Sequence, residues 1–522
     1  SWGNSLRLRA ADLSLQPLHA FAAGVESLPQ NLREVFAALD PAGRVDALQI
    51  SLGDANRPAD DWEVEAEFAA VSVAPYRGAP GGSGLRGYAR LGPGGGGVVV
   101  DSSDVSLAFP QVYRQPLAFD ELYGSLDLAW SGEQVRLTSG VLTARGEEGT
   151  ARALFSLDIP LVSSEIGPDM TLLVGLRDST PQYRSKYLPY VLNQGLLDWL
   201  SASIGGGVID DGAFLWRGSL RPQAVQRRTV QLAFNVRDTA LDYHPDWPAV
   251  TIDDGVVLID DGRVSVWADS GRLSESAVQN LSVETWVNPR GAVSLGVQGA
   301  ITGPAGDGLA VVNNSPLSGL VGDAFSQWSL RGDMQADLRL QLELGDNPPP
   351  PRVEVQTRWL DVDMDIAPGN LPVRGLHGDF AYSSARGFSA SELRGRLWGG
   401  DISARLEQTH SGAGYDPASS VLTVQVATDV AMAELREWLG LGALAFSSGE
   451  ASAGVGVRIA PGQPPTLTVD SDLQGVQLDL PQPWQKEAAE SLPLHLEMPL
   501  AGDRQVIELS LGEELNLALD IT

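Results

Sequence analysis

Many short segments of this chain alternate apolar with polar residues, and this pattern constrains the fold more than any other feature of the sequence. In "LRGRLWGGDISARL", residues 393 to 406, the apolar residues can share one face and the charged residues the other, with a turn at Gly399 and Gly400. Alternation with a period of two is typical of a β-strand with one buried face. The segment therefore predicts a β-hairpin with one dry side.

Four segments share a longer layout, in which an alternating strand shifts phase near a polar residue, adds a second apolar triplet and meets a proline. The copies begin at Val99, Val230, Val353 and Leu467, about 120 residues apart. Such regularity indicates a repeat architecture. We expect one continuous scaffold that consists of an N-terminal segment with a short helix (1–44), three β repeats each followed by a helix (45–210, 211–330 and 331–442) and a partial repeat (443–522).

Short helical patterns separate the β repeats, and they are predicted over residues 29–41, 181–207, 316–330 and 430–442. Apolar residues recur there at helical spacing, and prolines or glycines stand near the ends. Each helix packs its apolar stripe on the neighbouring sheet, plugs the end of a groove or touches a membrane. The strands themselves have two possible arrangements, since they could stack as sandwiches or curl into one long sheet whose apolar face lines a trough.

The charge of the chain argues against some classes of partner. Sixty-six acidic and 36 basic residues give a net charge of -30, which opposes the counterion release that drives nucleic-acid binding. The same charge weakens attraction to an anionic membrane surface, so any contact with lipid depends on apolar burial. The chain has no cysteine for a disulfide or a thiolate site, and its five histidines are not spaced as metal ligands. We therefore expect no nucleic-acid partner, no metal and no cofactor.

Motifs for covalent chemistry are weak in this sequence. Asp361, Asp363 and Asp365 alternate along one strand and could hold calcium, and a carboxylate pair that includes Asp253 or Asp260 could serve a glycosidase. Apolar residues fill the positions between the three alternating aspartates, however, so these aspartates are interpreted as a solvated outer face. We expect no catalytic residue, and the protein is interpreted as a non-enzyme.

Two segments carry a resemblance to a known family. The hairpin at 393–406 and "YLPYVLNQGLLDWLSASIGGGVIDDGAFLWRGSL", residues 187 to 220, resemble the AsmA-like YhdP family of Gram-negative bacteria, which is similar to TamB. The resemblance extends from about residue 45 to the end. It implies a mainly β fold: an elongated, highly curled antiparallel sheet with an open hydrophobic trough and a few short helices. It also implies an internal periplasmic fragment, whose inner-membrane anchor lies in a segment absent from this chain.

The function implied by the resemblance is transport without catalysis. Phospholipids would move between the inner and outer membranes with their acyl chains in a long hydrophobic groove, and the membranes would be contacted through parts outside this fragment. One alternative is a structural factor that assists outer-membrane protein assembly by offering a sheet edge to a client strand. Another is a carbohydrate-active enzyme on a β-solenoid that depends on Asp253 or Asp260.

The residues expected to line the groove are the apolar members of the alternating strands. They are Val105, Leu107, Phe109, Val230, Leu232, Phe234, Val353, Val355, Val362, Met364, Ile366, Leu393, Leu397, Ile402, Leu406, Val476, Leu478 and Leu480. A register slip of one residue would turn a strand's apolar residues outward. The register of each strand therefore decides which of them face the groove.

Overall fold

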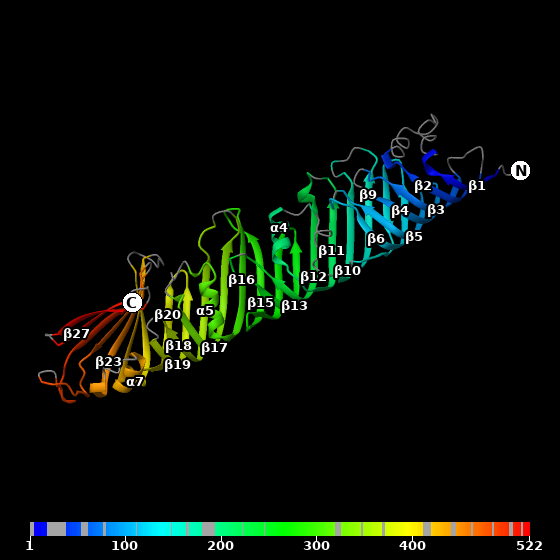
Figure 1. Ribbon diagram of the computed structural model, residues 1–522. Coiled ribbons are helices and arrows are strands. Elements are labelled where there is room, and N and C mark those ends of the chain that lie inside the picture. Colours follow the sequence, from blue (N-terminus) through cyan, green and yellow to red (C-terminus); the bar gives the residue numbers. More distant parts are fainter. Residues whose placement is uncertain are drawn as a thin grey trace. The chain divides into compact units, whose positions relative to one another are not determined.

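The computed structural model describes the chain apart from residues 1–4, 18–37, 54–60, 77–79, 111, 148, 163–164, 166, 180–189, 191–193, 222, 245, 319–324, 346–347, 368–370, 411–418, 440–444, 461–462, 483–484, 501–504, 513–514 and 522. The chain divides into two compact units. Unit 1 comprises Ser1–Leu241 and Asp254–Val266, and unit 2 comprises Asp242–Asp253 and Trp267–Thr522. Antiparallel strands dominate both units, which confirms the predicted mainly β fold (Figure 1).

Unit 1 is a meander in which strands pair with their neighbours in sequence. β7 and β8 act as two halves of one strand, because both lie between β6 and β9. The strands are β1 (Leu6–Ser14), β2 (Ala42–Leu52), β3 (Trp62–Val73), β4 (Gly81–Gly92), β5 (Gly95–Ala108), β6 (Leu117–Trp130), β7 (Gln134–Ser139), β8 (Leu142–Gly146), β9 (Gly149–Pro160), β10 (Asp169–Ser179), β11 (Val208–Ser219) and β12 (Arg228–Leu241). Helix α4 (Gln194–Ser203) and the 3-10 turn η2 (Val225–Arg227) interrupt them.

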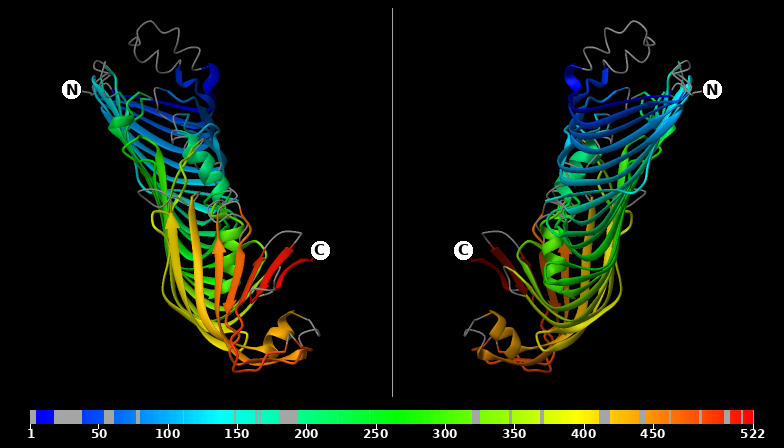
Figure 2. Two further views of the ribbon diagram at one scale, coloured as in Figure 1. Left: turned by 90° about the vertical axis from the view of Figure 1, so that its left-hand side faces the viewer. Right: turned by 90° about the vertical axis from the view of Figure 1, so that its right-hand side faces the viewer.

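Unit 2 repeats this meander with longer central strands, which bend along their length in Figure 2. β13 (Val250–Asp260) and β14 (Arg263–Leu273) contribute residues to both units. The remaining strands are β15 (Ser276–Val287), β16 (Val293–Pro304), β17 (Trp328–Glu343), β18 (Arg352–Ile366), β19 (Leu371–Ser383), β20 (Gly387–Leu397), β21 (Gly400–His410), β22 (Ser420–Ala431), β23 (Ser447–Ile459), β24 (Thr466–Ser471), β25 (Val476–Leu478), β26 (Leu494–Pro499), β27 (Gln505–Leu511) and β28 (Leu515–Ile521). Helices α5 (Ala305–Asn313) and α7 (Met432–Leu439) follow β16 and β22.

The phase shift expected in the repeats is a backbone irregularity. Asp104, Asp238 and Asp361 have φ of 53°, 50° and 55°, a left-handed conformation that aspartate tolerates better than most residues. Two of these residues face a glycine on the preceding strand: a Cβ at Gly84 would lie 2.6 Å from the Asp104 carbonyl oxygen, and one at Gly332 would lie 2.5 Å from that of Asp361. An extra residue of this kind bends and twists a strand.

The shift in β18 keeps one face of the strand apolar along its whole length. Val353 and Val355 are buried or half-buried before the irregularity, and Val362, Met364 and Ile366 are buried after it. Without the extra residue, the second set would point to the opposite face. The inserted residue thus sets the register on which the groove prediction depends.

The hairpin at 393–406 is present, but its turn differs from the prediction by one residue. Leu397 pairs with Gly400, so the two-residue loop is Trp398–Gly399, and both residues have positive φ (47° and 87°). Positive φ at both loop positions matches the twist of a two-residue hairpin. Gly400 instead begins β21, where a Cβ would lie 2.0 Å from the Asp429 carbonyl oxygen.

The helix predictions have mixed outcomes. Helix α7 lies within the predicted 430–442 segment and α4 within 181–207, whereas most of the predicted helix at 29–41 lies outside the described residues. The prediction at 316–330 is wrong at its end, because Trp328 opens β17 and its side chain alternates in phase with Leu330. Ser318 is helical, and residues 319–324 of the predicted segment lie outside the described residues. Helix α5, which the sequence did not predict, precedes this segment.

Candidate functional site

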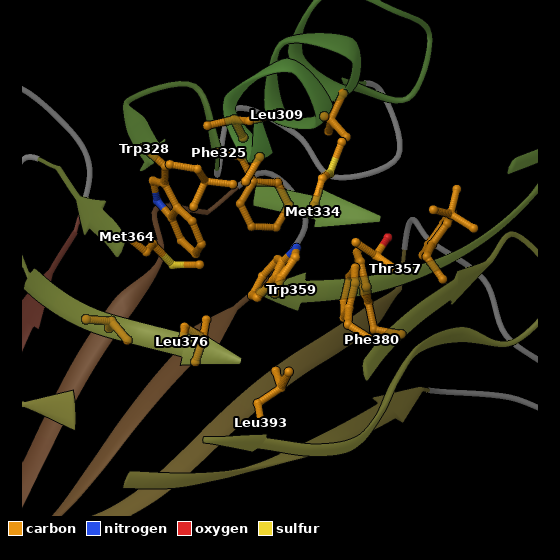
Figure 3. Close-up of a pocket in the computed structure, with 18 of the residues that line it drawn as sticks. Leu309, Phe325, Trp328, Met334, Thr357, Trp359, Met364, Leu376, Phe380 and Leu393 are labelled. Carbon is orange, nitrogen blue, oxygen red and sulfur yellow. The ribbon is translucent and has the colours of Figure 1, made fainter. Parts of the chain in front are cut away.

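An apolar cavity lies in unit 2. It has a volume of about 320 Å³ and is lined from β16 through β23, from α5 and from the segments beside it. Native interiors hold few voids larger than a water molecule, so a cavity of this size is more than a packing defect. Figure 3 shows Leu309 and Phe325 on the helix side, with Leu376 and Leu393 on strands across from them.

Aromatic side chains form one part of the cavity wall. Trp359 of β18 stacks on Phe380 of β19 with ring centroids 5.6 Å apart, and Phe380 stacks on Phe388 of β20 at 5.5 Å. Near α5, Phe325 meets Trp328 edge to face at 4.7 Å. Offset and edge-to-face pairs hold aromatic rings in fixed positions. This part of the wall is consequently broad and apolar.

Polar groups are rare in the cavity wall. Among the described lining residues, only Ser276, Asp307 and Thr357 have non-aromatic polar side chains, and none is a lysine or an arginine. The Asp307 carboxylate is already engaged, since it accepts hydrogen bonds from Ser276 Oγ at 2.7 Å and from the Glu275 backbone N–H at 3.0 Å. The cavity can therefore hold an apolar ligand, but it offers no cation to an anion.

The opposite face of the sheet is polar and carries cross-strand ion pairs. Arg358 pairs with Asp379 in unit 2 at 2.7 Å, and Arg237 pairs with Asp210 in unit 1 at 2.6 Å. The hydrogen bonds from these arginines hold the pKa of Asp379 and of Asp210 below the ordinary carboxyl value. Each unit thus has one face suited to water and one suited to apolar contact.

Three of the aspartates that were considered as metal ligands or catalytic groups have other partners. Asp365 pairs with Arg331 at 2.8 Å and with Arg374 at 2.5 Å, while Asp363 accepts a hydrogen bond from the Gly375 backbone N–H. Asp260 accepts one from Gln231. Within the described ranges, no group of acidic and histidine side chains is arranged to hold a metal ion.

The structure brings seven of the predicted residues together at the cavity. They are Val355, Met364, Ile366, Leu393, Leu397, Ile402 and Leu406. Val353 and Val362 are fully buried in the same strands but do not line it. Val476, Leu478 and Leu480 contribute to the hydrophobic cluster of unit 2 without reaching the cavity.

The predicted residues of unit 1 lie in two other places. Val105 is buried with Phe119 and Leu122, and Leu107 and Phe109 pack against that cluster. Val230, Leu232 and Phe234 lie on β12 opposite Trp216, Phe214 and Gly212 of β11. A Cβ at Gly212 would approach the Phe234 ring to 3.1 Å, which explains why a small residue interrupts this apolar face.

Some cavity residues were missed by the sequence reasoning. Trp359 follows Val353, Val355 and Thr357 in strict alternation, and this signal alone could have placed it on the apolar face. Phe325 and the α5 residues had no comparable signal.

In the described part of the chain, no helix is both long enough and apolar enough to cross a membrane.

Comparison with known proteins gives one family. The model of the family described as "YhdP protein" matches residues 1–522. The chain belongs to the YhdP family. This confirms the resemblance expected from the two sequence segments and places the alternating strands in a known group.

One relative from this family is similar along nearly the whole chain. The intermembrane phospholipid transporter YhdP of Escherichia coli (strain K12) is 21% identical over 515 residues, which is 97% of this chain. The match covers 39% of that transporter's own length. No solved structure matches the chain.

Proposed function

We propose that this chain is a non-enzymatic section of a phospholipid carrier that works in the periplasm between the inner and outer membranes. The acyl chains would lie against the apolar face of the sheet, and the headgroup would remain in water. The observation that carries the proposal is the unit 2 cavity, with its almost entirely apolar lining. The name of the Escherichia coli relative, an intermembrane phospholipid transporter, agrees with it.

The physical reason is the cost of exposing acyl chains. Each CH₂ group that leaves water for an apolar surface gains about 0.8 kcal/mol, so a lipid crossing an aqueous space needs a continuous apolar surface. A strand whose apolar residues face inward on both sides of a bulge provides such a surface, as β18 does. A protein of this kind needs no catalytic group, because no covalent bond changes during transport.

The proposal is tested by identifying lipid that copurifies with the chain. Val426 lines the cavity and its neighbour Gln425 on β22 is exposed, so Val426→Asp and Gln425→Asp introduce the same side chain on opposite faces. Because a buried carboxylate in contact with an acyl chain is unfavourable, we expect Val426→Asp to reduce bound phospholipid about tenfold or more. Gln425→Asp should retain it, as measured by quantitative mass spectrometry.

Circular dichroism of both variants controls for folding. A wild-type chain that copurifies with no phospholipid would contradict the proposal. Equal lipid content in the two folded variants would contradict it as well, because lipid would then be bound somewhere other than the apolar face.

A further inference from the structure

Helix α5 forms one wall of the cavity and faces the sheet across it. Ala305, Leu309 and Val312 all line the cavity, and their spacing places them on one helical face. Ala310 is exposed on another side of the helix. In Figure 3, Leu309 on α5 and Leu393 on β20 lie on opposite sides of the cavity. The helix therefore covers this part of the apolar face.

Two glycines allow α5 to lie directly on β17. A Cβ at Gly308 would lie 2.7 Å from Met334 Cε, and one at Gly306 would lie 3.2 Å from the Leu330 carbonyl oxygen. Glycine is unfavourable inside a helix, so its presence at two positions is explained by this close approach. The side chains of β17 that α5 packs against are apolar, so they form no hydrogen bonds with the helix.

The first turn of α5 is held by a small polar contact. Asp307 accepts hydrogen bonds from Ser276 Oγ, at the start of β15, and from the backbone N–H of Glu275 in the turn before it. Ser276 is fully buried and Asp307 is half-buried, whereas the hydrogen bond from the Glu275 N–H is exposed. A single carboxylate thus fastens the helix to the neighbouring hairpin, and we call this contact the Asp307 latch.

The position of α5 over the cavity conflicts with the movement of a whole phospholipid. The described lining of the cavity has one carboxylate and no basic side chain, so a phosphate would lose its hydration there without gaining an ion pair. Acyl chains can occupy the cavity, whereas the headgroup would have to remain in water beside it. Because α5 covers part of the apolar face, displacing the helix would enlarge the surface along which the acyl chains can move.

We propose that α5 is a gate over the apolar cavity, held shut by the Asp307 latch, and that it opens when a phospholipid passes. This inference rests on the proposed transport function. In the closed state the helix shields the cavity lining from water. Release of the latch exposes the apolar face, so that the headgroup can stay in solvent while the acyl chains move.

The absence of cysteine from the sequence permits a clean crosslinking test. In the double variant Ser276→Cys and Asp307→Cys, the latch becomes a disulfide that fixes α5 in the closed position. The matched control is Asp429→Cys with Ser452→Cys, which replaces another hydrogen-bonded serine–aspartate pair (2.6 Å) on exposed positions of β22 and β23. Thiol titration measures how completely each disulfide forms.

The readout is the rate at which the purified chain takes up a fluorescent phospholipid from vesicles of phosphatidylethanolamine and phosphatidylglycerol. We expect the oxidised latch variant to load about tenfold or more slowly than its reduced form, because opening the cover then limits the rate. The control pair should load at the same rate in both forms. Reductant should restore the latch variant.

A second variant, Asp307→Ala, removes the latch without a crosslink. We expect it to load several-fold faster than the wild type. Equal loading by the oxidised and reduced latch variants, with normal final occupancy, would overturn the gate and leave the transport proposal standing. Where the disulfide forms incompletely, an unchanged rate in Asp307→Ala overturns the gate. Failure of every form to take up phospholipid would contradict the transport proposal itself.

Discussion

Units 1 and 2 use the same strand pattern but fill their apolar faces differently. In unit 2 a large buried cluster surrounds a cavity whose wall includes Trp359, Phe380 and a covering helix. In unit 1 one cluster contains Val105 and Phe119, and large apolar side chains such as Leu6 and Val99 are exposed. The strand pattern determines which face is apolar. In unit 2, aromatic side chains and helix α5 together form the wall of a cavity.

The largest expected effect comes from placing a charge on the apolar face of each unit. Val355→Asp alters the cavity wall in unit 2, and Leu126→Asp alters the apolar face of unit 1. If both faces carry acyl chains, each change should reduce lipid delivery to the outer membrane about tenfold or more, measured by pulse-labelling in cells with the full-length protein. The controls are Gln356→Asp and Ala129→Asp at exposed positions of the same strands.

This experiment tests whether the apolar faces of the two units have the same function. Loss of transport in Val355→Asp alone would mean that only the cavity carries lipid. Normal transport in both inward variants, at normal protein abundance, would contradict a role for either apolar face.

A smaller effect is expected from the glycines that face the strand irregularities. Gly84 and Gly332 have φ of 76° and 112° and lie against the Asp104 and Asp361 carbonyl oxygens. Alanine at either position would be strained, and we expect a local loss of stability of about 1–3 kcal/mol. Hydrogen exchange of the two affected strand pairs measures this loss. Gly454→Ala is the control, since its nearest neighbouring atom is 3.9 Å away.

We expect similar losses of stability for Gly84→Ala and Gly332→Ala, because in both units a glycine lies against the irregular residue of the next strand. A loss confined to one unit would show that the bend is essential only there. Unchanged exchange in both would mean that the neighbouring strand adapts without cost.

The smallest effect concerns the ion pairs of the outer face. Arg237 and Arg358 hold the pKa of Asp210 and Asp379 below the ordinary carboxyl range, so each pair stabilises the fold above that range and loses its contribution as pH falls through the lowered pKa. In Arg237→Ala and Arg358→Ala, both carboxyl pKa values should rise toward about 3.9. Carboxyl titration by NMR measures the shift. Lipid content should not change, and a fall in either variant would contradict the separation of the two faces.

The sequence predicted the strands well where one face is wet and the other dry. Alternation identified Val353 and Val355, and it identified Met364 and Ile366 beyond the phase shift, because solvent and the apolar interior impose a period of two on each segment. Family membership also followed from short segments. These features depend on local order, which is visible in one sequence.

Features that depend on packing between elements were not predictable in this way. The hairpin turn uses Trp398 and Gly399 because Gly400 must fit beside the Asp429 carbonyl, a contact with β22. Helix α5 was missed because Gly306 and Gly308 lower helix propensity. The reason for these glycines is their contact with β17, which the sequence does not display.

The central claim, that the apolar face carries acyl chains, is tested most directly by photocrosslinking in cells. Leu406 lines the cavity and Arg405 beside it on β21 is exposed, so a photoreactive benzoylphenylalanine at each position samples opposite faces of one strand. We predict a phospholipid adduct, identified by mass spectrometry, that is about tenfold more abundant at Leu406 than at Arg405. Equal adducts at both positions, or none at Leu406, would contradict the account.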